Sequence, residues 1–292
     1  MSFCKRIVLS VAVAALASAA SLSLATAQTV AKVDAVAAML PKPIQDAGVL
    51  RIAIPDVGKP LSFKDGDALK GMDPDLAQAL AGVLGLKAEL NLIPFAAALT
   101  GLQANKYDVS YGQFYVTAAR LKVADFVTDW QDYSSFLVKK DGAFKPVKLD
   151  EICGHTIGAM AGSAELETVT KAAKDCSKAA TVSAFPSVSN SVLALNSGRV
   201  DGVLINRGGA QDAIHLDAGL DASGEIGGGP TAVAVARNEN SEKLLAAVKA
   251  AYDALIKSGD YAKILEKNDT SYGAAKSAEI FTANSTPPKY GF

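Results

Sequence analysis

The chain has 292 residues and a formal net charge of −1 at pH 7, and half of its residues are apolar. A near-neutral chain without a run of Lys and Arg residues lacks the electrostatic footprint of a nucleic-acid binder. The length falls between one large domain and two ordinary ones, and the apolar share is sufficient for a sizeable core.

The N-terminal 27 residues have the three parts of a secretory signal peptide. Lys5 and Arg6 form the positive segment, residues 7–24 form an apolar run, and residues 25–27 (Ala-Thr-Ala) have the pattern of a cleavage site. We expect cleavage after Ala27 and export to the periplasm. A membrane anchor is the alternative, but the run is rich in Ala and Ser and a cleavage site follows it at once. No later apolar stretch is long enough to span a bilayer.

An N-terminal extension, residues 28–47, precedes a first unit in which strands and helices alternate. Apolar, β-branched runs predict strands, and apolar residues at helical spacing predict helices. At the start of the first helix, Asp73 can cap the free amides and Pro74 fits the first helical position. We therefore interpret Asp73 and Asp75 as structural residues. The predicted strands are 49–54, 87–93 and 107–111, and the helices between them are 73–84 and 96–105.

The same alternation returns in a second unit. The strands expected there are 156–160, 181–185 and 200–205, with helices over 163–178 and 189–197. Extended runs over 135–140 and 232–237 bracket this unit, and two helices, 241–257 and 260–267, follow. Such an alternation is typical of mostly parallel sheets covered by helices.

The bracketing runs predict a discontinuous first lobe. Residues 48–137 and 234–292 would form lobe one, and residues 138–233 would form lobe two. Two strands that cross between lobes make a hinge, and ligand pockets favour such interfaces.

Two cysteines follow the signal peptide, Cys153 and Cys176. Thiols tend to pair in the oxidising compartment that an exported chain enters, although two separate buried thiols are the alternative. The histidines, His155 and His215, do not lie at zinc-finger spacing with the cysteines. We therefore predict no metal site, and nothing in the sequence indicates a cofactor.

Six segments, in order along the mature chain, resemble the bacterial extracellular solute-binding proteins of family 3, the polar amino-acid binding proteins of ABC importers. They are residues 48–52 (GVLRI), 71–77 (GMDPDLA), 102–108 (LQANKYD), 116–126 (VTAARLKVADF), 198–202 (GRVDG) and 259–264 (GDYAKI). The resemblance implies a type II periplasmic-binding-protein fold, with two α/β lobes and a two-strand hinge. It also implies a monomer that closes around a small carboxylate-bearing solute and serves a membrane permease. Some members have a disulfide that matches Cys153 and Cys176.

The resemblance further implies a set of ligand-binding residues. Arg120 would hold the ligand's carboxylate, because a guanidinium offers a rigid fork of donors. From residue type alone, it could equally be a surface arginine. Backbone amides near Ser163 and Ala164, at a helix start, would share the carboxylate. The other predicted pocket residues are Phe95, Gln113, Tyr115, Thr117 and Met160; Phe95 and Tyr115 could instead be packing residues.

Asn206 departs from the family pattern. Members that bind α-amino acids usually have an Asp here that holds the ligand's ammonium, whereas Asn is neutral. We therefore expect a ligand with a carboxylate but a substituted, displaced or absent α-amine, such as an opine-type conjugate, a small organic acid or a modified amino acid. Alternatively, Asn206 and a backbone carbonyl hold an ordinary amine, or the amine binds to Asp56, a backbone carbonyl or a ring face.

Two other functions are open at this point. An exported dehydratase-like enzyme on the same fold would need an acid beside Arg120, for which Asp56 and Glu165 are the candidates. We predict no catalytic residues, because no nucleophile–His–Asp motif is present. We do not expect the sensing domain of a receptor, because no kinase or membrane segment follows Phe292.

Overall fold

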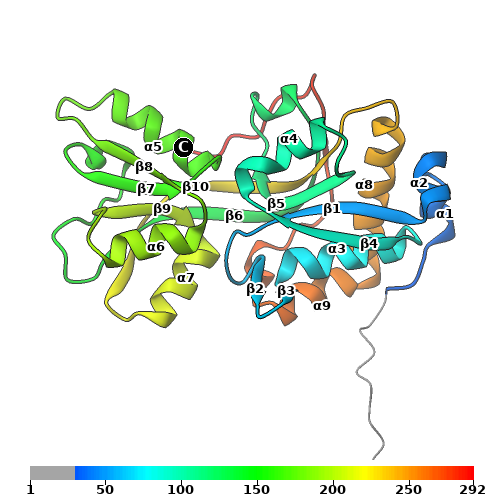
Figure 1. The fold of residues 1–292 in the computed structure, drawn as a ribbon, viewed down its shortest axis with the longest axis horizontal. Helices are drawn as coiled ribbons and strands as arrows, with labels where there is room; N and C mark the ends of the chain where they lie inside the picture. The colour runs from blue at the N-terminus through cyan, green and yellow to red at the C-terminus, as the bar shows by residue number, and fades with distance from the viewer. Residues whose placement is uncertain (1–29) are drawn as a thin grey trace, which may run out of the picture.

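The computed structural model describes residues 30–292 and contains two α/β lobes joined by two long strands (Figure 1). The predicted signal peptide and its cleavage after Ala27 lie outside these residues. The described chain begins with the short helices α1 (Asp34–Ala37) and α2 (Lys42–Ala47), and the latter ends at Gly48. Within residues 30–292, no helix is both long and apolar enough to cross a membrane.

The first lobe is a parallel sheet with helices packed on it. Strand β1 (Val49–Pro55) lies between β4 (Lys87–Ile93) and β5 (Val109–Tyr115). The apolar run of β1 is explained by burial, since Leu50, Ile52 and Ile54 are fully enclosed. The other elements of this lobe are β2 (Phe63–Asp65), β3 (Ala68–Lys70), α3 (Met72–Val83), α4 (Ala98–Gln103), α8 (Ser241–Ser258), α9 (Asp260–Lys267) and β11 (Ile280–Phe281).

The second lobe repeats this plan. Strand β7 (Thr156–Met160) lies between β8 (Thr181–Phe185) and β9 (Gly202–Asn206), and all three are parallel. Its helices are α5 (Ala164–Lys174), α6 (Val188–Asn196) and α7 (Arg207–Leu216). The two predicted α/β units are therefore confirmed, while α7 was not expected from the sequence.

Two antiparallel strands, β6 (Asp125–Lys139) and β10 (Leu220–Val235), run through both lobes. They give one continuous sheet of order β4-β1-β5-β10-β6-β9-β7-β8. Both strands are much longer than the extended runs predicted at 135–140 and 232–237, because each also pairs within the lobes. The exact lobe boundaries stay predictions.

The start of α3 differs from the expectation. Its N-cap is Gly71, and no side chain caps it. Instead, the backbone amides of Met72 and Asp73 donate to the carbonyl oxygens of Pro60 and Leu61. The prediction that Asp73 caps this helix is wrong, because a distant loop already satisfies the amides. Asp73 is fully buried and accepts a hydrogen bond from Gln113 Nε2 at 2.6 Å.

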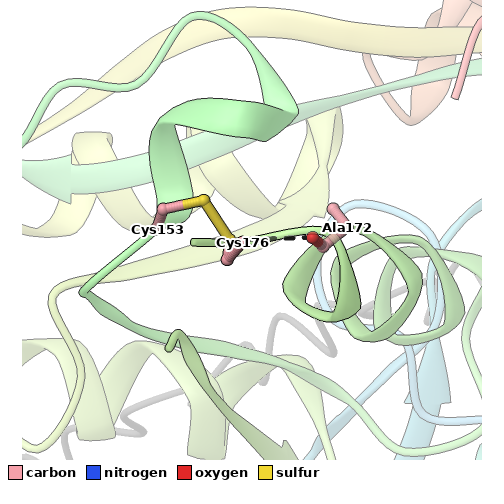
Figure 2. The surroundings of a disulfide bond; sticks show 3 residues. All are labelled: Cys153, Ala172 and Cys176. Carbon is pink, nitrogen blue, oxygen red and sulfur yellow. Dashed lines mark hydrogen bonds between the residues drawn. A yellow bond between two sulfur atoms is a disulfide. The ribbon is translucent and has the colours of Figure 1, made fainter. Parts of the chain in front are cut away.

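Cys153 and Cys176 form a disulfide, which confirms the predicted pairing (Figure 2). Their Cα atoms are 5.3 Å apart. The bond ties the segment before β7 to the chain just after α5, and Cys176 Sγ lies 3.6 Å from the carbonyl oxygen of Ala172. The disulfide thus lies within the second lobe, where Cys176 packs against the apolar core.

The last residues of the chain run from the first lobe to the second. Strand β11 pairs with the first-lobe part of β6, at Phe126 and Val127. From there the C-terminal tail, defined here as residues 282–292, passes to the side of the second lobe near α5 (Figure 1). Phe292 packs against the apolar core of the second lobe. The tail therefore contacts both lobes.

Candidate functional site

A cavity lies between the two lobes, beside the crossing strands. Eight of the ten predicted ligand-binding residues line it, and they come from both lobes. They are Phe95, Gln113, Tyr115 and Arg120 of the first lobe and Met160, Ser163, Ala164 and Asn206 of the second. The free space is only about 30 Å³, so a solute larger than a few waters can enter only if the walls move apart. Contact of these residues with a ligand stays a prediction.

Arg120 follows β5 in a short 3-10 turn (Arg120–Lys122), and its side chain is almost fully buried. Its Nη1 donates to the carbonyl oxygen of Tyr115 at 2.8 Å, and its Nη2 donates to that of Gly162 in the second lobe at 3.1 Å. Burial lowers the pKa of this guanidinium. No carboxylate within residues 30–292 forms an ion pair with it. Arg120 thus brings a positive charge into the cavity and links the two lobes.

Two helices begin at the cavity, each capped by a predicted site residue. Ser163 Oγ accepts from the amide of Leu166 at 3.1 Å at the start of α5, and Asn206 Oδ1 accepts from the amide of Gly209 at 3.0 Å at the start of α7. Asn206 therefore uses its oxygen for capping. Its Nδ2, a donor, has no hydrogen-bond partner in the described chain, and a donor suits a carboxylate better than an ammonium.

Gln113 and Tyr115, at the end of β5, line the cavity but are held by their neighbours. Gln113 has a φ of 55° and is bonded at both polar atoms, since its Nε2 donates to Asp73 and its Oε1 accepts from Thr231 Oγ1 at 2.5 Å. The hydroxyl of Tyr115 is 3.4 Å from Ser134 Oγ. Both side chains are therefore fixed parts of the wall.

Thr117 and Asp56 do not line the cavity. Thr117 Oγ1 accepts from the backbone amide of Arg120 at 3.3 Å, so it supports the turn that carries the arginine. Asp56 Oδ1 accepts from the amide of Gly58 at 3.2 Å within its own loop. The sequence motif around Thr117 thus predicted the position of the turn correctly, but Thr117 itself is not part of the cavity wall.

Two buried acids complete the cavity wall. Glu165, noted in the sequence as a candidate acid, accepts from Ser134 Oγ at 2.8 Å. Asp132 was missed; it is 2% exposed, and its Oδ1 accepts from the amide of Tyr133 at 2.8 Å. Burial raises the pKa of Asp132 to about 8. No local signal singles it out in the sequence, because Asp125 and Asp129 lie in the same strand.

The cavity thus combines a buried cation, two helix N-termini and two buried acids, with aromatic and apolar side chains around them. This set can bind a small polar solute by charge and hydrogen bonding. Within residues 30–292, no group of three or more His, Cys, Asp or Glu side chains is arranged to hold a metal ion.

Comparisons with known proteins agree with this architecture. The chain is 24% identical to the probable amino-acid-binding protein YxeM of Bacillus subtilis over 231 residues. This aligned region covers 76% of this chain and 84% of the relative. It is similar to the solved structure of an ancestral arginine-binding protein bound to arginine, with a TM-score of 0.71 and 32% identity, over 76% of this chain and 98% of the other.

A second similar structure is the ancestral amino acid-binding protein AncCDT-1, described as a precursor of cyclohexadienyl dehydratase. Its TM-score is 0.69 and its identity 25%, over 77% of this chain and 97% of the other. The family model of the bacterial extracellular solute-binding proteins, family 3, matches residues 50–269. The fold is therefore the type II periplasmic-binding-protein fold, and the chain belongs to the bacterial extracellular solute-binding proteins, family 3.

Proposed function

We propose that the chain is the periplasmic substrate-binding component of an ABC importer, which closes its lobes around a small carboxylate-bearing solute and delivers it to a membrane permease. The solute class is an amino acid or an amino-acid derivative. The protein would act as a monomer, without a cofactor, after cleavage of the signal peptide behind Ala27. Export of its relatives, which are named as extracellular or periplasmic binding proteins, supports this location.

The observation that carries the proposal is the position of Arg120. Its guanidinium lies in the cavity between the lobes and donates to the carbonyl oxygen of Gly162 on the opposite lobe. The start of α5, at Ser163, adds free amides beside it. A carboxylate placed there would be bound by both lobes at once and would favour the closed arrangement, because a ligand shifts a conformational equilibrium by its differential affinity.

Thermal-shift screening of amino acids, amino-acid conjugates and small acids tests the proposal, since a ligand that binds only the native state raises its stability. We expect a carboxylate-bearing solute to raise Tm, and Arg120→Ala to weaken its binding by about two to three decades, or 2–5 kcal/mol. Arg199→Ala, which removes an arginine that does not line the cavity, is the matched control. Near-wild-type affinity in a folded Arg120→Ala protein would contradict the assignment.

A dehydratase-like enzyme acting on a prephenate-like acid is the second candidate. It is favoured by one observation, the presence of buried acids in the cavity that contains Arg120, and by the similarity to the dehydratase precursor. Incubation with prephenate and detection of the aromatic product separates the two functions. Turnover that is lost in Asp132→Asn or Glu165→Gln would favour the enzyme, and binding without turnover favours the importer component.

A further inference from the structure

The charges in the cavity are not paired with one another. Arg120 makes its hydrogen bonds to two carbonyl oxygens, whereas the two acids bond to Tyr133 and Ser134. Within residues 30–292, no ion pair joins the arginine to either acid. A buried charge is costly unless it is paired, so the cavity is best satisfied by a ligand that supplies an anionic group for Arg120 and a cationic group for an acid in its ionised form.

The two acids lie close together, next to Asn206. Ser134 and Asp132 are two residues apart on β6, a spacing that places side chains on one face of a strand. Ser134 donates to Glu165, and its Cα is paired with that of Asn206 on β9. Both acids and Asn206 therefore line the same part of the cavity, beside the crossing strand β6.

We infer that Asp132, with Glu165 beside it, binds a positively charged group of the ligand that is displaced from the α-position. The inference rests on the proposed function and specifies its ligand class. That class is a solute with a carboxylate for Arg120 and an ammonium or guanidinium further along its chain. Asn206, with its oxygen committed to capping α7 and a free amide nitrogen, does not serve this cation.

Binding of such a cation should be coupled to loss of a proton. Burial raises the pKa of Asp132 to about 8, and the charges of Glu165 and Asp73 add to the rise. The other titratable side chains that face Asp132 are Tyr115 and Tyr272. At pH 7 the ligand-free Asp132 is therefore mostly protonated. A cationic ligand pairs with the ionised carboxylate, so its binding releases this proton to the solvent.

The cation Arg207 lies near this group but is already engaged. Its guanidinium carbon is 4.5 Å from the centre of the Tyr272 ring, and it forms no ion pair with Asp132. A positive charge on Arg207 opposes the rise in the pKa of Tyr272. The side chain of Arg207 thus packs on Tyr272 and does not neutralise Asp132, although a backbone hydrogen bond from Arg207 opposes the rise in the pKa of this carboxyl group.

Matched probes test the inference. The ω-amino acids β-alanine, 4-aminobutanoate, 5-aminopentanoate and 6-aminohexanoate are compared by calorimetry with plain acids of equal chain length and with the α-amino isomers. We expect one ω-amino acid to bind at least tenfold more tightly than its plain acid and its α-amino isomer. At pH 7, calorimetry in two buffers of different ionisation enthalpy should detect proton release on binding.

Asp132→Asn should remove both the preference for the amine and the proton release, while plain-acid binding through Arg120 persists. Asp129→Asn is the matched control, because Asp129 is equally buried on β6 but does not line the cavity. The inference is overturned if no ω-amino acid binds better than its plain acid, or if Asp132→Asn keeps the preference. If unsubstituted carboxylic acids bind through Arg120 and an added amine does not increase their affinity, the proposed function remains intact. If no carboxylate raises Tm in the thermal-shift screen, both the proposed function and this inference are rejected.

Discussion

The ring of Tyr290, in the C-terminal tail, packs edge-to-face on the ring of Tyr115, with their centroids 4.7 Å apart. The Tyr290 hydroxyl accepts a hydrogen bond from the amide of Val116 at 2.7 Å, and its carbonyl oxygen accepts from the amide of Gly228 on β10 at 2.8 Å. Tyr290 lies beyond residue 269, where the family match ends. A residue outside the family match thus supports the wall of the cavity.

We predict that Tyr290→Ala weakens ligand binding by up to about tenfold, because an aromatic pair of this kind contributes about 0.5–1.5 kcal/mol. Calorimetry with the ligand found by screening measures the effect. Tyr290→Phe should keep the ring contact and lose only the hydrogen bond to Val116. Lys289→Ala, an exposed neighbour in the tail, is the control. Unchanged affinity in Tyr290→Ala would show that the tail does not support Tyr115.

Asn206→Asp is expected to preserve the fold, because Asp and Asn are equally good N-caps. If the pocket keeps the family geometry, the new carboxylate should tighten the binding of ordinary α-amino acids. Asn206→Ala should lower the free energy of unfolding by about 0.5–2 kcal/mol through loss of the cap on α7. Submicromolar binding of an unmodified α-amino acid that is unchanged in Asn206→Ala would contradict our interpretation of this position.

Reduction of the Cys153–Cys176 bond should destabilise the protein by about 3 kcal/mol, as expected for a closed loop of this length. Chemical denaturation with and without reductant measures the loss, and a Cys153→Ser/Cys176→Ser variant should show the same loss without reductant. Mass spectrometry of the unreduced mature protein should find no free thiol. Two free thiols there would refute the bond.

The ligand-free protein should become less stable as the pH rises from about 5 to about 8. Burial raises the pKa of Asp73 to about 7 and that of Asp132 to about 8. In this pH range the unfolded chain has already lost these protons while the folded chain retains them, so unfolding becomes more favourable with rising pH. Thermal melts at several pH values measure the slope. Asp73→Asn should reduce it, and a stability that increases from pH 5 to pH 8 would refute the assignment.

The alternation of strands and helices could be predicted from the sequence because it depends on local patterns, namely apolar runs for strands and apolar residues at helical spacing for helices. The run at β1 is largely apolar because most of the strand is buried, with the half-exposed Arg51 as its one charged residue. The turn at Arg120 follows a recognisable motif. Asp132 could not be predicted in the same way. Its place in the cavity wall depends on β6 passing between the lobes beside the start of α5, an arrangement that no local pattern encodes.

Long-range contacts explain the remaining differences. The cap expected at Asp73 is absent because the carbonyl groups of Pro60 and Leu61 already bind the first amides of α3. The contact of Tyr290 with Val116 joins residues 174 positions apart. Neither relationship follows from periodicity or residue type, since both depend on where distant segments of the folded chain meet.

The position of Phe292 also determines where the protein can be labelled. This last residue packs against the core of the second lobe, and its ring centroid is 5.2 Å from that of Tyr115 in the cavity wall. An affinity tag fused directly behind it would start beside the ligand cavity and compete with this packing. Tags and immobilisation handles therefore belong ahead of α1, whereas a fluorophore at the exposed Lys289 would report movement of the tail.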